Sequence, residues 1–164
     1  MTSTILLAGG GTGGHIFPLV ALAETLGQAG WNGAAHFAIG NRPGEADWVE
    51  GFSHTELPLC GGSLWRRLGE ICSGEIAAWK LLNEVQPELV IATGGYVSLA
   101  VCSAAWTRGI PYVLIEPNQV AGKANRLLSQ GAKRIYTAFP GVAGLPVSKV
   151  LLTGLPVRKK VLEQ

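Results

Sequence analysis

The chain has 164 residues, of which 48% are hydrophobic, and its formal net charge is +2 at pH 7. This length is that of one domain, and so large a share of apolar residues excludes global disorder. The small net charge argues against a polybasic nucleic-acid binder, and three widely spaced cysteines without a CxxC pair argue against a disulfide framework or a zinc ribbon.

Short apolar or β-branched runs alternate along the chain with longer amphipathic segments. The expected strands are residues 4–8, 34–39, 54–59, 88–92, 112–115, 134–137 and 149–152, and the expected helices are residues 17–29, 45–50, 64–85, 97–108 and 121–129. Strands that are nearly all apolar and alternate with helices are typical of a parallel sheet. The sequence therefore predicts an α/β fold, a Rossmann-like parallel sheet with helices on both faces.

A glycine-rich stretch, GGGTGGH over residues 9–15, stands between the first expected strand and the first expected helix. Glycines let the backbone approach a ligand closely, and a helix N-terminus offers free N–H groups, so the stretch favours a phosphate. Gly9, Gly11 and Gly14 also fit the G-x-G-x-x-G fingerprint, but no carboxylate follows the second strand before Glu45 to hold a ribose, which argues against NAD. A tight turn without a ligand is the alternative.

A second glycine pair, Gly94–Gly95, follows the fourth expected strand and precedes a helix in the same way. Because the carboxyl ends of parallel strands share one edge of the sheet, two such loops predict two anionic groups or one long diphosphate ligand there. Glu116 and Asn118 end the fifth strand, and they either face the same crevice or cap the helix expected from residue 121.

Groups for acid–base chemistry are few. Asp47 is the only aspartate, which excludes an Asp-x-Asp metal site, an aspartate pair for glycoside hydrolysis and an EF-hand. His36 and His54 lie within expected strands and are interpreted as ordinary structural histidines. His15 lies at the mouth of the first glycine loop, where it suits a general base for a hydroxyl or only positions the ligand through a hydrogen bond.

Aromatic and basic residues stand together at the start of the long helix. Trp65, Arg66 and Arg67 occupy its first turn, and Trp106 follows in the next helix. Tryptophan and arginine suit a membrane interface, where the ring sits at headgroup level and the guanidinium meets anionic lipid. The alternative is an ordinary core helix with a solvated basic turn.

These motifs occur together in the order seen in one known family. They are GGTGGH over residues 10–15, GGYVS over 94–98, Glu116-x-Asn118, AFPG over 138–141 and PVR over 156–158. The set resembles the MurG family, the UDP-N-acetylglucosamine transferases of peptidoglycan synthesis, over essentially the whole chain. Ile115 and Pro117 stand where the family often has histidine and glutamine.

The resemblance implies the N-terminal half of a GT-B glycosyltransferase. Residues 1–164 would form a Rossmann-like acceptor-binding domain, and the C-terminal UDP-GlcNAc-binding domain would be absent from this chain, which alone would be inactive. The family transfers GlcNAc from UDP-GlcNAc to the C4 hydroxyl of MurNAc in lipid I, with inversion, and makes lipid II. It needs no metal and no cofactor, and it works peripherally at the cytoplasmic face of the bacterial inner membrane.

The resemblance also assigns residues to roles. Thr12, Gly13, Gly14, Asn118 and Arg158 would bind UDP-GlcNAc, and Gly94, Gly95, Tyr96 and Asn125 would bind the acceptor. His15 is the candidate general base, with Glu116 as the other candidate. Trp65, Arg66, Arg67 and Trp106 would contact the anionic membrane surface. Two alternatives remain open from the sequence: a stand-alone acceptor-binding subunit of a split GlcNAc transferase, and a nucleotide-binding Rossmann module without transferase chemistry.

Overall fold

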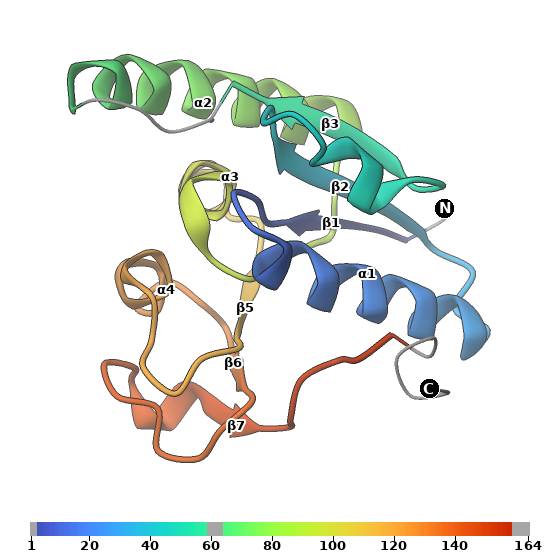
Figure 1. Cartoon of the computed structure of the whole chain (residues 1–164), viewed down its shortest axis with the longest axis vertical. Helices are drawn as coiled ribbons and strands as arrows, with labels where there is room; N and C mark the ends of the chain where they lie inside the picture. The colour runs from blue at the N-terminus through green and yellow to red at the C-terminus, as the bar shows by residue number, and fades with distance from the viewer. Residues whose placement is uncertain (1–2, 59–63, 159–164) are drawn as a thin grey trace.

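Parallel strands form one sheet, and helices lie on both of its faces (Figure 1). The computed structural model describes residues 3–58 and 64–158, without the side chains of residues 64–72. The strands are β1 (Thr4–Ala8), β2 (Ala34–Gly40), β3 (Ser53–Leu57), β4 (Leu89–Ala92), β5 (Tyr112–Glu116), β6 (Ile135–Thr137) and β7 (Val150–Leu152). The helices are α1 (Gly13–Gln28), α2 (Leu64–Val85), α3 (Gly95–Thr107) and α4 (Lys123–Leu128), with short 3-10 turns η1 (Ala46–Val49) and η2 (Val147–Lys149).

The strand order is β3-β2-β1-β4-β5-β6-β7, and each neighbouring pair is parallel. The order reverses direction between β1 and β4, where Ala8 pairs with Ala92. Ligands of doubly wound sheets bind at this point, outside the carboxyl ends of the strands. The two glycine-rich loops leave these two neighbouring strands, so the fold brings them together. The predicted Rossmann-like sheet is confirmed.

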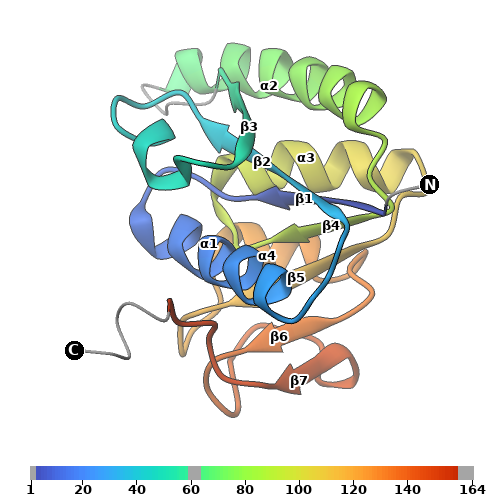
Figure 2. The same cartoon turned by 90° about the vertical axis from the view of Figure 1, so that its right-hand side faces the viewer.

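Two apolar cores lie on the two faces of the sheet. Ile5 and Leu7 of β1 face α1, whereas Leu6 and Ala8 face α2 and α3 because successive side chains alternate. Figure 2 shows α2 and α3 together on one side of the sheet, with α1 on the other. Each strand near the centre is therefore apolar on both faces, which explains the near-continuous hydrophobic runs in the sequence.

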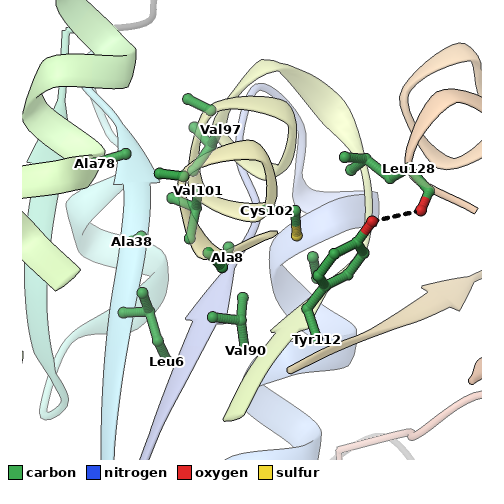
Figure 3. Close-up of a cluster of buried hydrophobic side chains, with 14 of the residues drawn as sticks. Leu6, Ala8, Ala38, Ala78, Val90, Val97, Val101, Cys102, Tyr112 and Leu128 are labelled. Atoms are coloured by element: carbon green, nitrogen blue, oxygen red, sulfur yellow. Dashed lines mark hydrogen bonds between the residues drawn. The ribbon is translucent and has the colours of Figure 1, made fainter. Parts of the chain in front are cut away.

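The larger core includes one buried polar contact (Figure 3). The Tyr112 hydroxyl donates to the Leu128 carbonyl at 2.6 Å, which ties β5 to α4. Burial raises the pKa of Tyr112 to about 12, so the hydroxyl keeps its proton and remains a donor. Burial also raises the pKa of the Cys102 thiol, which makes this side chain an inert apolar filler.

Two helices begin earlier than the sequence pattern predicts. The expected starts were residues 17 and 97, but α1 begins at Gly13 and α3 at Gly95. Glycine disfavours helix, so the pattern placed the starts after the glycines. The N–H groups of a first helical turn have no partner within the helix, so glycines there leave these donors accessible to a ligand. The bounds of α2 agree with the prediction, and the expected helix over 45–50 is the shorter turn η1.

Candidate functional site

The first glycine loop, residues 9–12, is tightly packed on one side and open on the other. A Cβ on Gly9 would lie 2.7 Å from Thr93 Oγ1, and one on Gly10 would lie 2.9 Å from Val97 Cγ2. Gly11 has a φ of 87°, which side-chain-bearing residues rarely adopt. A Cβ on Gly14, in contrast, would have only Thr12 Oγ1, at 3.8 Å, nearby. The first two glycines therefore serve packing, and the space for a ligand lies farther along, at the start of α1.

Glu45 holds the first glycine loop in place. This residue is 1% exposed, and its two carboxylate oxygens accept hydrogen bonds from Gly11 N (3.0 Å) and Gly40 N (2.9 Å). Arg42 adds a bond from Nη1 to the Gly11 carbonyl at 2.8 Å. Because the Glu45 carboxylate is buried and binds backbone N–H groups, it does not offer the free carboxylate that a dinucleotide-binding fold uses for the ribose. The engagement of Glu45 with the backbone is therefore a second observation against NAD binding.

The second glycine loop, Gly94–Gly95, contacts the first. Both glycines have positive φ, 107° and 83°, and a Cβ on Gly95 would lie 2.9 Å from the Gly10 carbonyl oxygen. Thr93 Oγ1 donates to the His15 carbonyl at 2.6 Å. Ser98 Oγ accepts from Gly94 N and donates to the Ala8 carbonyl at 2.9 Å. The sequence places Thr93 and Ser98 beside the glycine pair but assigns no role to their hydroxyl groups.

His15 lies between the two loops with a defined hydrogen-bonding state. Its Nδ1 is 3.2 Å from the Gly10 carbonyl oxygen, which can only accept, so Nδ1 carries the hydrogen. In the neutral ring the lone pair is then on Nε2. A neutral imidazole with its orientation fixed by a carbonyl is what a general base requires.

His15 lines a cavity of about 400 Å³, here called the His15 cavity. Its other lining residues are Thr93, Gly94, Gly95, Tyr96, Leu99, Glu116, Asn118, Gly122, Lys123, Ala124, Asn125 and Leu127. The structure thus brings together His15, both glycines of the second loop and the polar residues that follow β5. All residues predicted to bind the acceptor lie around this one cavity.

Glu116 is the centre of a hydrogen-bond network in the wall of the His15 cavity. It is 1% exposed. Its Oε1 accepts from the backbone N and the Nδ2 of Asn118, both at 2.9 Å, and its Oε2 accepts from Gly122 N and Asn125 Nδ2, both at 2.9 Å. Four donors occupy the lone pairs of this carboxylate, so the geometry favours His15 over Glu116 as the proton acceptor.

The residues predicted to face UDP-GlcNAc are divided among cavities. Gly13, Gly14 and Arg158 line a second cavity of about 360 Å³, together with Phe17, Pro18 and residues 155–157. Thr12 lines a smaller one of about 180 Å³, and Asn118 lines the His15 cavity.

Arg158 has a partner within the chain. Its Nη2 lies 2.7 Å from Glu24 Oε1 on α1, and its Nε donates to the same oxygen at 3.0 Å. The guanidinium therefore binds a carboxylate of α1 through Nε and Nη2, which are two of its three nitrogens. The assignment of Arg158 to the sugar nucleotide stays a prediction.

The residues predicted to contact a membrane do not lie together. Trp106 is 68% exposed at the end of α3, where Arg108 lies over the Trp79 ring with 5.1 Å between guanidinium carbon and ring centroid. Trp65 lies about four turns of α2 before Trp79, roughly 20 Å along the helix axis. The side chains of Trp65, Arg66 and Arg67 lie outside the described residues. None of the helices, within the described ranges, has the length and apolar character needed to cross a membrane.

The other two histidines lie away from the cavity. His36 Nε2 is 2.9 Å from Thr55 Oγ1, between β2 and β3, and burial lowers the pKa of His36. His54 Nδ1 contacts the Phe52 carbonyl at 3.1 Å. His36 is partly buried and His54 is exposed, and neither lines the His15 cavity. Across residues 3–58 and 64–158, no group of three or more His, Cys, Asp or Glu side chains could hold a metal ion.

Comparison with protein families gives a match to the glycosyltransferase family 28 N-terminal domain over residues 5–137. Among curated proteins, the UDP-N-acetylglucosamine–N-acetylmuramyl-(pentapeptide) pyrophosphoryl-undecaprenol N-acetylglucosamine transferase of Salinibacter ruber is 32% identical over 96% of this chain and 45% of its own length. The protein of the same name from Dechloromonas aromatica is 38% identical over 98% and 46%. The chain spans about half the length of the curated relatives it matches.

Solved structures also match this chain over about half of their own length. MurG of Acinetobacter baumannii matches with a TM-score of 0.79 and 26% identity, over 97% of this chain and 47% of that protein. A UDP-GlcNAc 2-epimerase from Methanocaldococcus jannaschii, in complex with UDP-GlcNAc and UDP, matches with a TM-score of 0.72 over 94% and 47%. At 17% identity, the likeness to the epimerase shows the fold alone.

Proposed function

Since the chain belongs to glycosyltransferase family 28, we propose that it is the acceptor-binding half of an inverting hexosyltransferase that transfers GlcNAc from UDP-GlcNAc to lipid I. The acceptor group is the C4 hydroxyl of MurNAc, and the product is lipid II of peptidoglycan synthesis. The donor would be held mainly by a second, C-terminal domain, equivalent to the part of the relatives that this chain does not span. The transferase names of the relatives support this assignment.

The observation that carries the proposal is the position of His15 between the two glycine loops. Its Nδ1 donates to the Gly10 carbonyl, which leaves Nε2 free to accept a proton. The ring lines a cavity of about 400 Å³, which Lys123 and Leu127 of α4 also line. Both substrates carry diphosphates, which suit positive-φ glycine loops at the starts of α1 and α3.

In the reaction we propose, the MurNAc C4 hydroxyl attacks the anomeric carbon of GlcNAc as its proton passes to His15 Nε2. The bond between the anomeric carbon and the UDP oxygen breaks, and UDP leaves with the electron pair. Attack from the face opposite the leaving group inverts the anomeric centre. General-base catalysis of this kind contributes about 10²–10⁴-fold to the rate.

The same proposal includes a membrane-facing surface at the end of α3. Ile76, Trp79 and Trp106 are 59%, 41% and 68% exposed, and Arg108 adds a cation beside Trp79. Exposed aromatic and basic groups support contact with anionic lipid at the cytoplasmic face of the bacterial inner membrane. Replacing Ile76 and Trp106 by serine should weaken binding to phosphatidylglycerol vesicles about fivefold or more in a sedimentation assay.

A matched control separates this surface from general hydrophobicity. Leu151, 46% exposed on the edge strand β7, should tolerate serine without loss of vesicle binding. Equal losses in the two variants would speak against a membrane-facing surface at α3.

The transferase activity is tested in a chimera. The N-terminal half of Acinetobacter baumannii MurG is replaced by this chain, and transfer of radiolabelled GlcNAc to a short-chain lipid I analogue is measured. The chimera is expected to turn over. The His15→Ala variant of the chimera is expected to retain about 1% or less of that activity. A chimera that folds and binds UDP-GlcNAc, but transfers no GlcNAc, would contradict the proposal.

A further inference from the structure

The accessible face of α3 carries no charged side chain. The residues of α3 that are not buried are Gly95, Tyr96, Leu99, Ser103, Trp106 and Thr107. Their spacing of three or four places them on one face of the helix. Exposed helix faces usually carry charged or polar groups, but α3 contains no Asp, Glu, Lys or Arg. This face, here called the α3 stripe (Tyr96, Leu99, Ser103 and Trp106), therefore suits an apolar occupant.

The rest of α3 is covered by the protein itself. The helix packs against α2 on one side and α4 on the other (Figures 1 and 2). Its opposite face, which includes Val97 and Val101, belongs to the larger core (Figure 3). The α3 stripe is thus the part of this helix that remains open to a ligand.

The α3 stripe connects the His15 cavity with the surface proposed to face the membrane. At one end, Tyr96 and Leu99 line the cavity. At the other end, Trp106 is 68% exposed near Trp79 and Arg108. Tyr96 and Trp106 are ten residues apart, which is about 15 Å along the helix axis. A molecule lying on the stripe would therefore reach from the cavity to that surface.

The border of the His15 cavity has the same apolar character on α4. Leu127 is 72% exposed and Tyr96 is 42% exposed, and both line the cavity. Lys123, one turn before Leu127, also lines it. Glu116 and Asn125 of the same wall are each 1% exposed. An exposed cation beside exposed apolar side chains suits the junction between a diphosphate and an apolar chain.

The width of the α3 stripe favours a single chain over a protein partner. Stable protein interfaces bury about 800 Å² on each partner. The stripe is one row of side chains between two packed helices, which is narrow for such an interface. An isoprenoid chain is apolar, and it loses no hydrogen bonds when it leaves water for an uncharged surface of this width.

We propose that the α3 stripe binds the isoprene units of lipid I that lie nearest its diphosphate. The polyprenyl chain then runs along α3 from the His15 cavity, past Leu99 and Ser103, to Trp106 and the membrane. The inference deepens the proposed function and rests on it, because the occupant is the lipid part of the acceptor substrate.

Calorimetric titration of the chain with two soluble lipid I analogues tests the inference. One analogue carries a farnesyl group on the diphosphate and the other a methyl group. Since each buried methylene strengthens binding about fourfold, the farnesyl analogue is expected to bind about tenfold or more tightly than the methyl analogue. This ratio of affinities needs no variant.

A charge in the middle of the α3 stripe should reduce that ratio. Ser103→Glu places a carboxylate where the isoprenoid would exclude water, so the ratio is expected to fall to about twofold or less. Repulsion of the diphosphate would weaken both analogues alike and cancel in the ratio. Ser103→Ala keeps the stripe uncharged and should preserve the ratio. Gln28→Glu, the matched control, adds the same charge at an exposed position of α1 on the opposite face of the sheet and should also preserve it.

The outcomes separate the inference from the proposed function. Equal affinity of the unaltered chain for the two analogues would overturn the role of the α3 stripe and leave the proposed function standing, as would be seen if the stripe binds a protein partner. A ratio that survives in folded Ser103→Glu would show that the farnesyl group binds elsewhere, which also overturns the inference. An unaltered chain that binds neither analogue would overturn the proposed function and the inference with it.

Discussion

Glu45 and Glu116 are two buried carboxylates at the same edge of one sheet, and they do different work. Each is 1% exposed, and each stands at or just after the end of a strand. Glu45 accepts from two backbone N–H groups, those of Gly11 and Gly40. Glu116 accepts from two backbone N–H groups and also from the side-chain amides of Asn118 and Asn125, which line the His15 cavity.

The difference shows that the role of a buried carboxylate depends on which groups donate hydrogen bonds to it. Glu45 shapes the backbone of a glycine loop, so its removal should act first on stability. Glu116 orients side chains that face a ligand, so its replacement by an isosteric amide should act first on affinity. Four donors occupy the lone pairs of Glu116, and Glu45 does not line the His15 cavity, which leaves proton transfer to His15.

The largest effect should follow from removing the base that neither carboxylate can replace. In the chimera, His15→Ala is expected to lower kcat about 10²–10⁴-fold, because no general base then accepts the proton of the acceptor hydroxyl. Glu116→Gln should instead raise KM and leave the pH profile of kcat in place. His54→Ala, an exposed histidine outside the cavity, is the control. A decrease in kcat of less than tenfold for His15→Ala would show that another group is the general base.

Removal of Glu45 should be the largest effect on stability. Glu45→Ala leaves the buried N–H of Gly40 and the N–H of Gly11 without their acceptor, so the free energy of unfolding should fall by about 2–4 kcal/mol. Urea denaturation followed by circular dichroism measures it. The exposed Glu50→Ala, five residues on, should change the same quantity by less than about 0.5 kcal/mol. Similar values for the two variants would show that Glu45 does not hold the loop.

The smallest effect should come from a buried polar contact that serves neither loop. Tyr112→Phe removes the hydrogen bond to the Leu128 carbonyl and should lower the free energy of unfolding by about 1–2 kcal/mol. Affinity for the lipid I analogue should stay unchanged, because Tyr112 does not line the His15 cavity. A loss of affinity in this variant would show that a loss of stability alone weakens binding. The effects of Glu45 on stability and of Glu116 on affinity would then not be separable.

The sequence predicts the fold well because its signals are local. The predicted strands agree with the observed ones within one residue, and the third within two, and the period of residues 64–85 gives the bounds of α2. The starts of α1 and α3 were placed too late because glycine carries an unfavourable helix propensity that the first turn of a helix tolerates. Hydrophobic periodicity and helix propensity depend only on residues that are close in the sequence, so they predict strands and helices.

The site is less predictable because its contacts join distant parts of the chain. Glu45 meets Gly11, and Thr93 meets the His15 carbonyl, across sequence separations of 34 and 78 residues. No local pattern distinguishes Glu45 from a solvated glutamate. Trp106 and the first turn of α2 were grouped by composition, but Trp106 lies at the end of α3, where Arg108 contacts Trp79, and about four turns of α2 separate Trp79 from Trp65.

We propose above that the His15 cavity binds the acceptor substrate. The most direct measurement is calorimetry of this chain with a soluble short-chain lipid I analogue, with UDP-GlcNAc and NAD titrated under the same conditions. The lipid I analogue is expected to bind, UDP-GlcNAc to bind weakly or not at all, and NAD not to bind. Binding of NAD without binding of the lipid I analogue would contradict the proposal.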